Sequence, residues 1–212
     1  MARRFPNDVT TLGGFPAPTQ ECYDSLAAIL DDAKATGIFY DSPPQPPDGW
    51  AILVGAPLFQ MILENGKAGA ASPSRESVPE FIELTAADSP EMLALAQLTK
   101  PGPFGLRTRE LGTYLGIRQG GQLVAMAGER LRVPGFTEIS AVCTHPDHTG
   151  HGYAAALMGE LARRIQARGE VAFLHVRGDN TRAISLYEHL GYRKRVLLHF
   201  AVVRKPSEEA AA

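Results

Sequence analysis

A buried strand leads directly into a glycine loop and a helix in the segment Ile139-Ser-Ala-Val-Cys-Thr-His-Pro-Asp-His-Thr-Gly-His-Gly-Tyr-Ala-Ala-Ala-Leu157. Glycine lets backbone N–H groups turn toward a ligand, because it carries no side chain. The first turn of a helix adds unsatisfied N–H groups and about half a positive charge. The segment therefore predicts a bend that binds an anion such as a diphosphate, without the need for a lysine.

A dinucleotide-binding fold is one alternative for this bend, because Gly150-x-Gly152 precedes small residues. In that fold the first glycine follows the strand almost directly. Here the residues 145–149 intervene, and no series of repeated βαβ units surrounds them. The spacing disfavours the dinucleotide fold, and a glycine loop without any ligand is the other alternative.

The residues around the bend predict a sheet covered by helices. Strands are expected over 80–84, 113–118, 122–129, 137–144, 171–176 and 194–203, and helices from 88 to a proline break at 101–103, over 152–168 and over 180–190. This order places antiparallel strands first and a parallel crossover around the helix 152–168. The expected fold class is α+β (α/β), with a mixed, mostly antiparallel central sheet flanked by helices.

Two motifs resemble those of the GNAT superfamily of acyl-CoA-dependent N-acetyltransferases. The run Thr149-Gly-His-Gly-Tyr-Ala154 resembles the family motif R/Q-x-x-G-x-G/A, which follows a strand of the type V-x-T-x-P. The run Asn180-x-x-Ala183-x-x-x-Tyr187-x-x-x-Gly191-Tyr192 resembles the second coenzyme A motif of the family. The resemblance covers roughly residues 80–204, and it implies the GNAT fold, in which a splayed pair of parallel strands binds acyl-CoA.

The resemblance implies acetyl-CoA as the co-substrate and two sets of residues that bind it. The diphosphate would lie on Thr149, Gly150, His151, Gly152, Tyr153 and Ala154. Coenzyme A would also contact Ala141, Val142, Cys143, Thr144, Asn180 and Ala183, with the pantetheine arm paired to the backbone of Cys143 and Thr144 like an added strand. The backbone N–H near Val142 would hold the acyl oxygen. The hydroxyl of Thr149 and the imidazole of His151 bind phosphate less strongly than guanidinium, so we expect weaker or pH-sensitive affinity.

The resemblance also suggests which side chains move protons. Tyr187 would be the general acid that protonates the departing thiolate, and packing alone is the alternative, because it lies on an apolar stripe. Glu138 at the start of the strand 137–144 is the candidate general base, with Glu129 and Glu110 as rivals. An amine that arrives already neutral would need no base.

Two further kinds of chemistry, a cysteine nucleophile and a metal site, are disfavoured. Cys143 as a nucleophile would need an exposed thiol beside a base, whereas a cysteine in a buried strand more often packs as a small apolar residue. His145, His148 and His151 lack the companion ligands of usual metal sites, so no metal is expected. The remaining histidines at 175, 189 and 199 are scattered and predict no site.

The composition limits the partners and the compartment. The chain of 212 residues carries 21 Lys and Arg against 23 Asp and Glu, so it lacks the basic field of nucleic-acid-binding proteins. Its two cysteines fit a reducing compartment, and its beginning lacks the apolar run of a secretory signal. The apolar run 51–63 is too short to span a bilayer. We expect a cytoplasmic protein with neither nucleic acid nor membrane as a partner.

The chain is expected to divide near the Gly-, Ala- and Ser-rich segment 64–79. Residues 1–79 would form an accessory region, as in the glycine N-acyltransferase-like branch of the family. In this region Thr19 caps a helix that stops at Gly37, residues 41–49 are irregular, and 50–54 and 58–63 are short strands. The GNAT acetyltransferase domain would cover 80–205, and 206–212 would be a disordered tail.

The expected function is N-acetyltransfer from acetyl-CoA to a primary amine of a small molecule, amino acid or peptide. By resemblance, the amine attacks directly in a ternary complex. A catalytically silent acyl-CoA-binding or sensing domain is the alternative, because Thr149 stands where the family usually has Arg or Gln. The amine acceptor and the acyl-chain preference stay open, and a homodimer is an expectation at the level of the family only.

Overall fold

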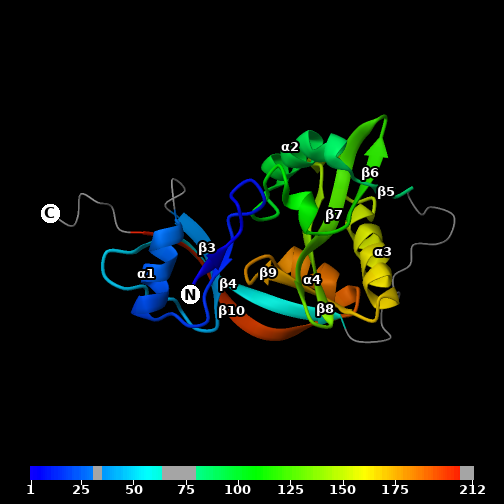
Figure 1. Ribbon diagram of the computed structural model, residues 1–212. Coiled ribbons are helices and arrows are strands. Elements are labelled where there is room, and N and C mark those ends of the chain that lie inside the picture. The colour runs from blue at the N-terminus through cyan, green and yellow to red at the C-terminus, as the bar shows by residue number, and fades with distance from the viewer. Residues whose placement is uncertain (31–34, 64–79, 206–212) are drawn as a thin grey trace.

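An eight-stranded sheet organises the computed structural model, which describes residues 1–30, 35–63 and 80–205 (Figure 1). The strand order is β3-β10-β4-β9-β8-β7-β6-β5, and a separate small sheet pairs β1 (Arg3–Arg4) with β2 (Gly13–Gly14). The strands of the large sheet are β3 (Ala35–Tyr40), β4 (Ala51–Leu63), β5 (Ile82–Glu83), β6 (Tyr114–Gln119), β7 (Gln122–Val133), β8 (Phe136–Thr144), β9 (Val171–Arg177) and β10 (Tyr192–Arg204).

In the described parts of the chain, four helices lie against the sheet or beside it. They are α1 (Gln20–Ile29), α2 (Ser89–Thr99), α3 (Tyr153–Ala167) and α4 (Thr181–His189), with 3₁₀ turns η2 (Ala86–Asp88), η3 (Thr108–Leu111) and η4 (Pro146–His148). Tyr114 packs in the cluster of α2, and the next residue, Leu115, packs in the cluster of α3. Because neighbouring strand residues point to opposite faces, α2 and α3 cover opposite faces of the sheet (Figure 1). No helix in the described parts of the chain is both long and apolar enough to cross a lipid bilayer.

The parallel pair β8 and β9 is the feature that positions the site. These strands pair at Phe136–Val171, Thr137–Ala172 and Glu138–Phe173, and their pairing ends there, while every other pairing of strands in the sheet is antiparallel. Beyond Glu138 the register of β8 with β7 shifts, and Ala141 has a φ of 53°, in the left-handed region. The predicted mixed sheet and its splayed parallel pair are therefore present.

The first 63 residues do not stand apart from this sheet. Two short strands were predicted over 50–54 and 58–63, but the structure has one strand, β4, across both. Strand β4 pairs with β10 on one side and with β9 on the other. The sheet therefore spans the boundary expected near residue 79. The segment 64–79 and the tail 206–212 lie outside the described residues.

The predicted helix near the N-terminus begins as expected but ends earlier. Thr19 caps α1, since its Oγ1 accepts a hydrogen bond from the N–H of Cys22 at 3.4 Å. The predicted end at Gly37 is wrong, because α1 ends at Ile29 and Gly37 lies in β3. A Cβ at Gly37 would lie 2.5 Å from Cζ of Phe200. This glycine therefore allows a close contact between strands.

Candidate active site

A cavity of about 420 Å³ lies where β8 and β9 diverge. Its walls come from both of these strands, from α4, from the turn after α2, and from β3, β4 and β10. The predicted site residues that line it are Ala141, Val142, Asn180, Ala183 and Tyr187. The structure thus brings together the proposed acyl-binding strand and the second motif, although 40 residues separate them in the chain.

The predicted anion-binding bend follows the splayed end of β8. Gly150 and Gly152 have φ values of 86° and 76°, which glycine adopts without strain. Helix α3 begins at Tyr153, and no side chain caps its N-terminus among the described residues. Its first backbone N–H groups therefore remain available to an anion. Thr149 donates its hydroxyl hydrogen to the carbonyl of Pro146 at 3.1 Å, so in this structure that hydroxyl supports the loop.

The loop histidines contact one another and the neighbouring residues of the loop. The His151 ring stacks on Tyr153 with centroids 5.5 Å apart, and its Nδ1 lies 3.2 Å from the carbonyl of His148. The described residues contain no group of three or more His, Cys, Asp or Glu that could hold a metal ion. Cys143 is buried in the cluster of α2, and this burial raises the pKa of its thiol to about 11. A protonated, buried thiol is a poor nucleophile.

The second motif forms the start of α4. The Asn180 side chain accepts a hydrogen bond from the N–H of Ala183 at 3.1 Å and so caps the helix. Tyr187 lies on the same helix, is 9% exposed, and lines the cavity. Burial raises the pKa of its phenol to about 12. The hydroxyl therefore keeps its proton at neutral pH, as a general acid must.

Glu138 lies behind the residues that line the cavity. Its side chain has no exposed surface, and it accepts hydrogen bonds from Nε and Nη2 of Arg130 at 2.9 and 2.7 Å. Burial alone would raise the pKa of Glu138, but the charge of Arg130 and the hydrogen bonds from His175 and Arg130 outweigh it and lower the pKa to about 2. Glu138 is thus held as a carboxylate and does not line the cavity. This geometry does not favour direct contact with an amine.

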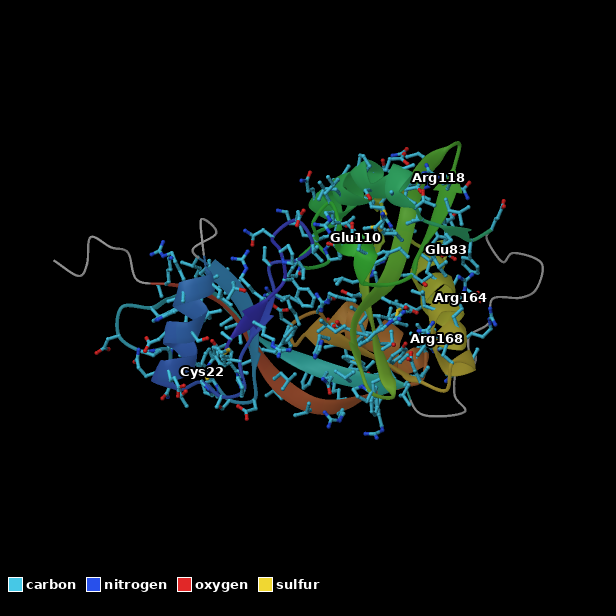
Figure 2. The ribbon with its side chains drawn as sticks, viewed as in Figure 1. Cys22, Glu83, Glu110, Arg118, Arg164 and Arg168 are labelled. Atoms are coloured by element: carbon cyan, nitrogen blue, oxygen red, sulfur yellow. The ribbon has the colours of Figure 1, made fainter. Side chains whose placement is uncertain are left out.

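The two rival glutamates lie outside the cavity wall as well. Glu129 is buried in ion pairs with Arg132 and Arg168. Glu110, which is labelled in Figure 2, lies exposed on η3. It pairs with Arg107 at 2.7 Å. Neither residue belongs to the lining of the cavity. Each has a local partner that accounts for its charge.

His175 is the residue that sequence reasoning missed. Its Nδ1 lies 2.7 Å from Oε1 of Glu138, its ring stacks on Phe39 with centroids 4.5 Å apart, and it lines the cavity. These partners lie on other strands, far away in the chain. The available signal was the spacing of two residues between Phe173 and His175 on β9, which places both side chains on one face of the strand.

Comparisons with known proteins agree with this geometry. The family described as FR47-like protein matches residues 114–201. The N-alpha-acetyltransferase RimI of Mycobacterium tuberculosis is 38% identical over 122 residues, which cover 52% of this chain and 76% of that protein. An acetyltransferase from Sodalis glossinidius is 49% identical over 49 residues, which cover 23% of this chain and 34% of the relative.

A solved structure matches almost the whole chain. It is a GNAT-family acetyltransferase from Novosphingobium aromaticivorans with 36% sequence identity and a TM-score of 0.84. The match covers 97% of this chain and 89% of that protein. It therefore includes the first 63 residues as well as the two motifs. Together with the match to RimI, this places the chain in the GNAT family of N-acetyltransferases.

Proposed function

We propose that the protein transfers the acetyl group of acetyl-CoA to a primary amine in a single ternary complex. The thioester would lie between β8 and β9, where their pairing ends at Glu138 and Phe173 and the cavity opens. This opening carries the proposal, because strands that part expose backbone groups that can pair with an extended pantetheine arm.

The diphosphate of acetyl-CoA would bind at the bend of residues 149–154. The first N–H groups of α3 and the left-handed backbone at Gly150 and Gly152 support this assignment. The N–H near Val142 would hold the thioester oxygen as negative charge develops on it. Ala141, Cys143 and Thr144 would supply the backbone beside the arm, while Asn180 and Ala183 would contact it from α4.

Tyr187 would protonate the departing thiolate. It lies in the cavity wall, and among the described residues no hydrogen bond fixes its hydroxyl elsewhere. Tyr187→Phe keeps the ring and removes the proton, so we expect kcat to fall about 100-fold while acetyl-CoA affinity stays within about twofold. Stopped-flow measurement of thiol release would check this, and an unchanged kcat would leave Tyr187 with a packing role alone.

The acceptor is a small-molecule, amino-acid or peptide amine. The M. tuberculosis relative is named an N-alpha-acetyltransferase, so α-amino groups come first among the candidates. The cytoplasmic location and a homodimer stay predictions.

Binding and turnover test the proposal together. We expect calorimetry to register acetyl-CoA binding, and a panel of free amino acids, short peptides and polyamines to contain an acceptor that releases thiol. Gly152→Ala places a side chain on left-handed backbone and should weaken acetyl-CoA binding about tenfold. Gly159→Ala in the middle of α3 meets open space and should leave it unchanged. Binding without release for every amine would instead favour a silent sensor of acyl-CoA, and no binding would reject both.

A further inference from the structure

Among the described residues, the lining of the cavity contains no carboxylate that could take a proton from an amine. Its described lining includes the cationic side chains Lys100, Arg130 and Arg177, and neither Asp nor Glu. An ammonium ion would meet no counter-charge on this surface. His175 is the one lining side chain of a type that takes up a proton near neutral pH. The nitrogen of an amine must lose protons when it attacks a thioester and becomes part of an amide. A proton acceptor therefore matters, and so do the position of the His175 ring and the nitrogen that carries its hydrogen.

One neighbour determines which nitrogen of His175 carries the hydrogen. Oε1 of Glu138 lies 2.7 Å from Nδ1. The two hydrogen bonds from Arg130 hold Glu138 as a carboxylate, which only accepts hydrogen bonds. Nδ1 of His175 must therefore donate. In the neutral ring the lone pair then lies on Nε2.

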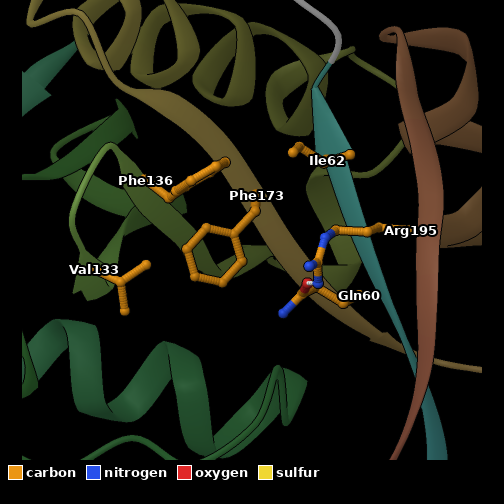
Figure 3. A pocket seen from close by; sticks show the side chains of 6 residues that line it. All are labelled: Gln60, Ile62, Val133, Phe136, Phe173 and Arg195. Carbon is orange, nitrogen blue, oxygen red and sulfur yellow. Dashed lines mark hydrogen bonds between the residues drawn. The ribbon is translucent and has the colours of Figure 1, made fainter.

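A second neighbour leads to the same tautomer independently. Nε2 of Gln60 lies 3.2 Å from Nε2 of His175. Oε1 of the same amide accepts a hydrogen bond from Nη1 of Arg195 at 2.7 Å, and Figure 3 shows these two side chains together. The guanidinium fixes the orientation of the amide, because a flipped amide would place two donors against each other. An amide nitrogen can only donate, so Nε2 of His175 must accept.

A bulge in β10 places Arg195 where it can hold the amide of Gln60. The register of β10 with β4 shifts between Lys194 and Val196. Arg195 is the extra residue at this bulge, and its guanidinium reaches the amide of Gln60 beside the ring of Phe173 (Figure 3). The chain of contacts therefore runs across five strands, from Arg195 through Gln60, His175 and Glu138 to Arg130.

The ring stands where the two parallel strands have parted. His175 lies two residues beyond Phe173, the last residue of β9 that pairs with β8, and Ser140 lies two residues beyond Glu138, the last residue of β8 that pairs with β9. Both line the cavity. Phe39 covers one face of the His175 ring, and the edge of Phe173 contacts it with centroids 5.7 Å apart. Packing and hydrogen bonds thus leave the ring one orientation, with its lone pair toward β4.

We propose that Nε2 of His175 accepts the proton that the acceptor amine loses as it attacks the thioester, with Glu138 and Gln60 as positioning residues. This inference rests on the proposed acetyl transfer. The amine would take the place of the Gln60 N–H at Nε2. Its nitrogen forms the C–N bond, the C–S bond breaks with its electron pair on sulfur, and the proton of the nitrogen moves to Nε2. Tyr187 protonates the thiolate, after which the imidazolium loses its proton to solvent and the phenolate regains one.

The charged groups around the ring suit this step. Glu138 faces the ring from β8 and stabilises the imidazolium that forms, while Arg130 on β7 keeps that carboxylate ionised. Gln60 on β4 is neutral and separates the ring from the charge of Arg195 on β10. From β3, Phe39 stacks on the ring. On β9 itself, Arg177 pairs with Asp179.

The first test replaces the ring and compares two histidines. With the best amine of the panel, we expect His175→Gln to lower kcat at neutral pH about 100-fold and to leave the Kd of acetyl-CoA within about twofold. His199→Gln is the control, because His199 lies on β10 and outside the cavity lining, and it should keep its rate. A His175→Gln enzyme with near-normal kcat would overturn the inference.

The pH profile separates proton transfer from packing. In the wild-type enzyme, kcat/KM should fall on the acid side as an imidazole becomes charged. In His175→Gln this acid limb should be lost, and the remaining pH dependence should follow only the neutral fraction of the free amine. A profile of unchanged shape with a lower plateau would mean that His175 only supports the fold, and it would overturn the inference.

A measurement without any acceptor tests the tautomer. Long-range ¹H–¹⁵N NMR of the wild-type protein, assigned with His175→Gln, should show Nδ1 protonated and Nε2 bare at about pH 8. A proton on Nε2 would overturn the inference and leave the proposed acetyl transfer standing. If wild-type protein failed to bind acetyl-CoA, the proposed function itself would fall, whatever the tautomer.

Discussion

Two buried carboxylates on neighbouring strands of the sheet have different surroundings. Glu129 on β7 and Glu138 on β8 have no exposed surface, and each pairs with arginine. The partners of Glu129 are Arg132 and Arg168, which are 49% and 36% exposed. Glu138 pairs with Arg130, which is 7% exposed, and also with a histidine in the cavity wall.

The difference shows that burial alone does not tell a structural carboxylate from one that takes part in a functional site. Glu129 ties β7 to the residue that follows α3, and its charge meets arginines that reach water. Glu138 faces a side chain that can change protonation and touch a ligand. The first arrangement is that of a structural ion pair, and the second is that of a positioning residue behind a proton acceptor.

The largest expected effect concerns stability. Glu138→Ala leaves the Arg130 charge buried and unpaired, so we expect it to lower the free energy of unfolding by about 3–5 kcal/mol. Glu129→Ala should cost about 1–2 kcal/mol, because its arginines can turn to water. Urea unfolding of both variants measures the difference. Equal losses would mean that the two pairs are energetically alike.

The acid side of the stability curve should show the second effect. The pKa of Glu138 in the folded protein, about 2, lies below its ordinary value of 4.5. A lowered folded pKa gives stability that is fully present above about pH 4.5 and is lost as the pH falls toward about 2. The shift corresponds to about 3 kcal/mol. Urea unfolding between these pH values should show a shallower decline for Glu138→Gln than for the wild type, and parallel curves would contradict the ion pair.

The smallest expected effect is that of salt. Raising NaCl from about 0.1 M to about 1 M shortens the screening length from about 10 Å to about 3 Å. The exposed arginines around Glu129 should then lose about 0.3–0.5 kcal/mol of their coupling, and the Arg130–Glu138 pair should lose less. Double-mutant cycles at both salt concentrations measure these couplings. A larger salt effect at Glu138 would show that water reaches that pair.

The sequence predicted the second half of the molecule well because local signals there agree with the final packing. The glycines at 150 and 152 and the amphipathic run after them predicted the bend and α3, and Asn180 predicted the start of α4. The helix end predicted at Gly37 was wrong. A glycine required by a close contact between strands looks the same in sequence as one that ends a helix.

The proton-transfer network was beyond sequence reasoning. The family resemblance predicted Glu138 as a general base, and that role stays a prediction. Its partner at position 175 comes from a strand that becomes its neighbour only after folding. The bulge that directs Arg195 to Gln60 leaves no pattern in composition or periodicity. Contacts between distant strands depend on register, which a single sequence does not reveal.

The most direct measurement is hydrogen–deuterium exchange of the whole protein with and without saturating acetyl-CoA. The account predicts slower exchange for the backbone amides of 140–144 and 150–155, where the arm and the diphosphate would bind, and little change around Glu129. Unchanged exchange at both segments, or protection confined to another part of the sheet, would contradict it.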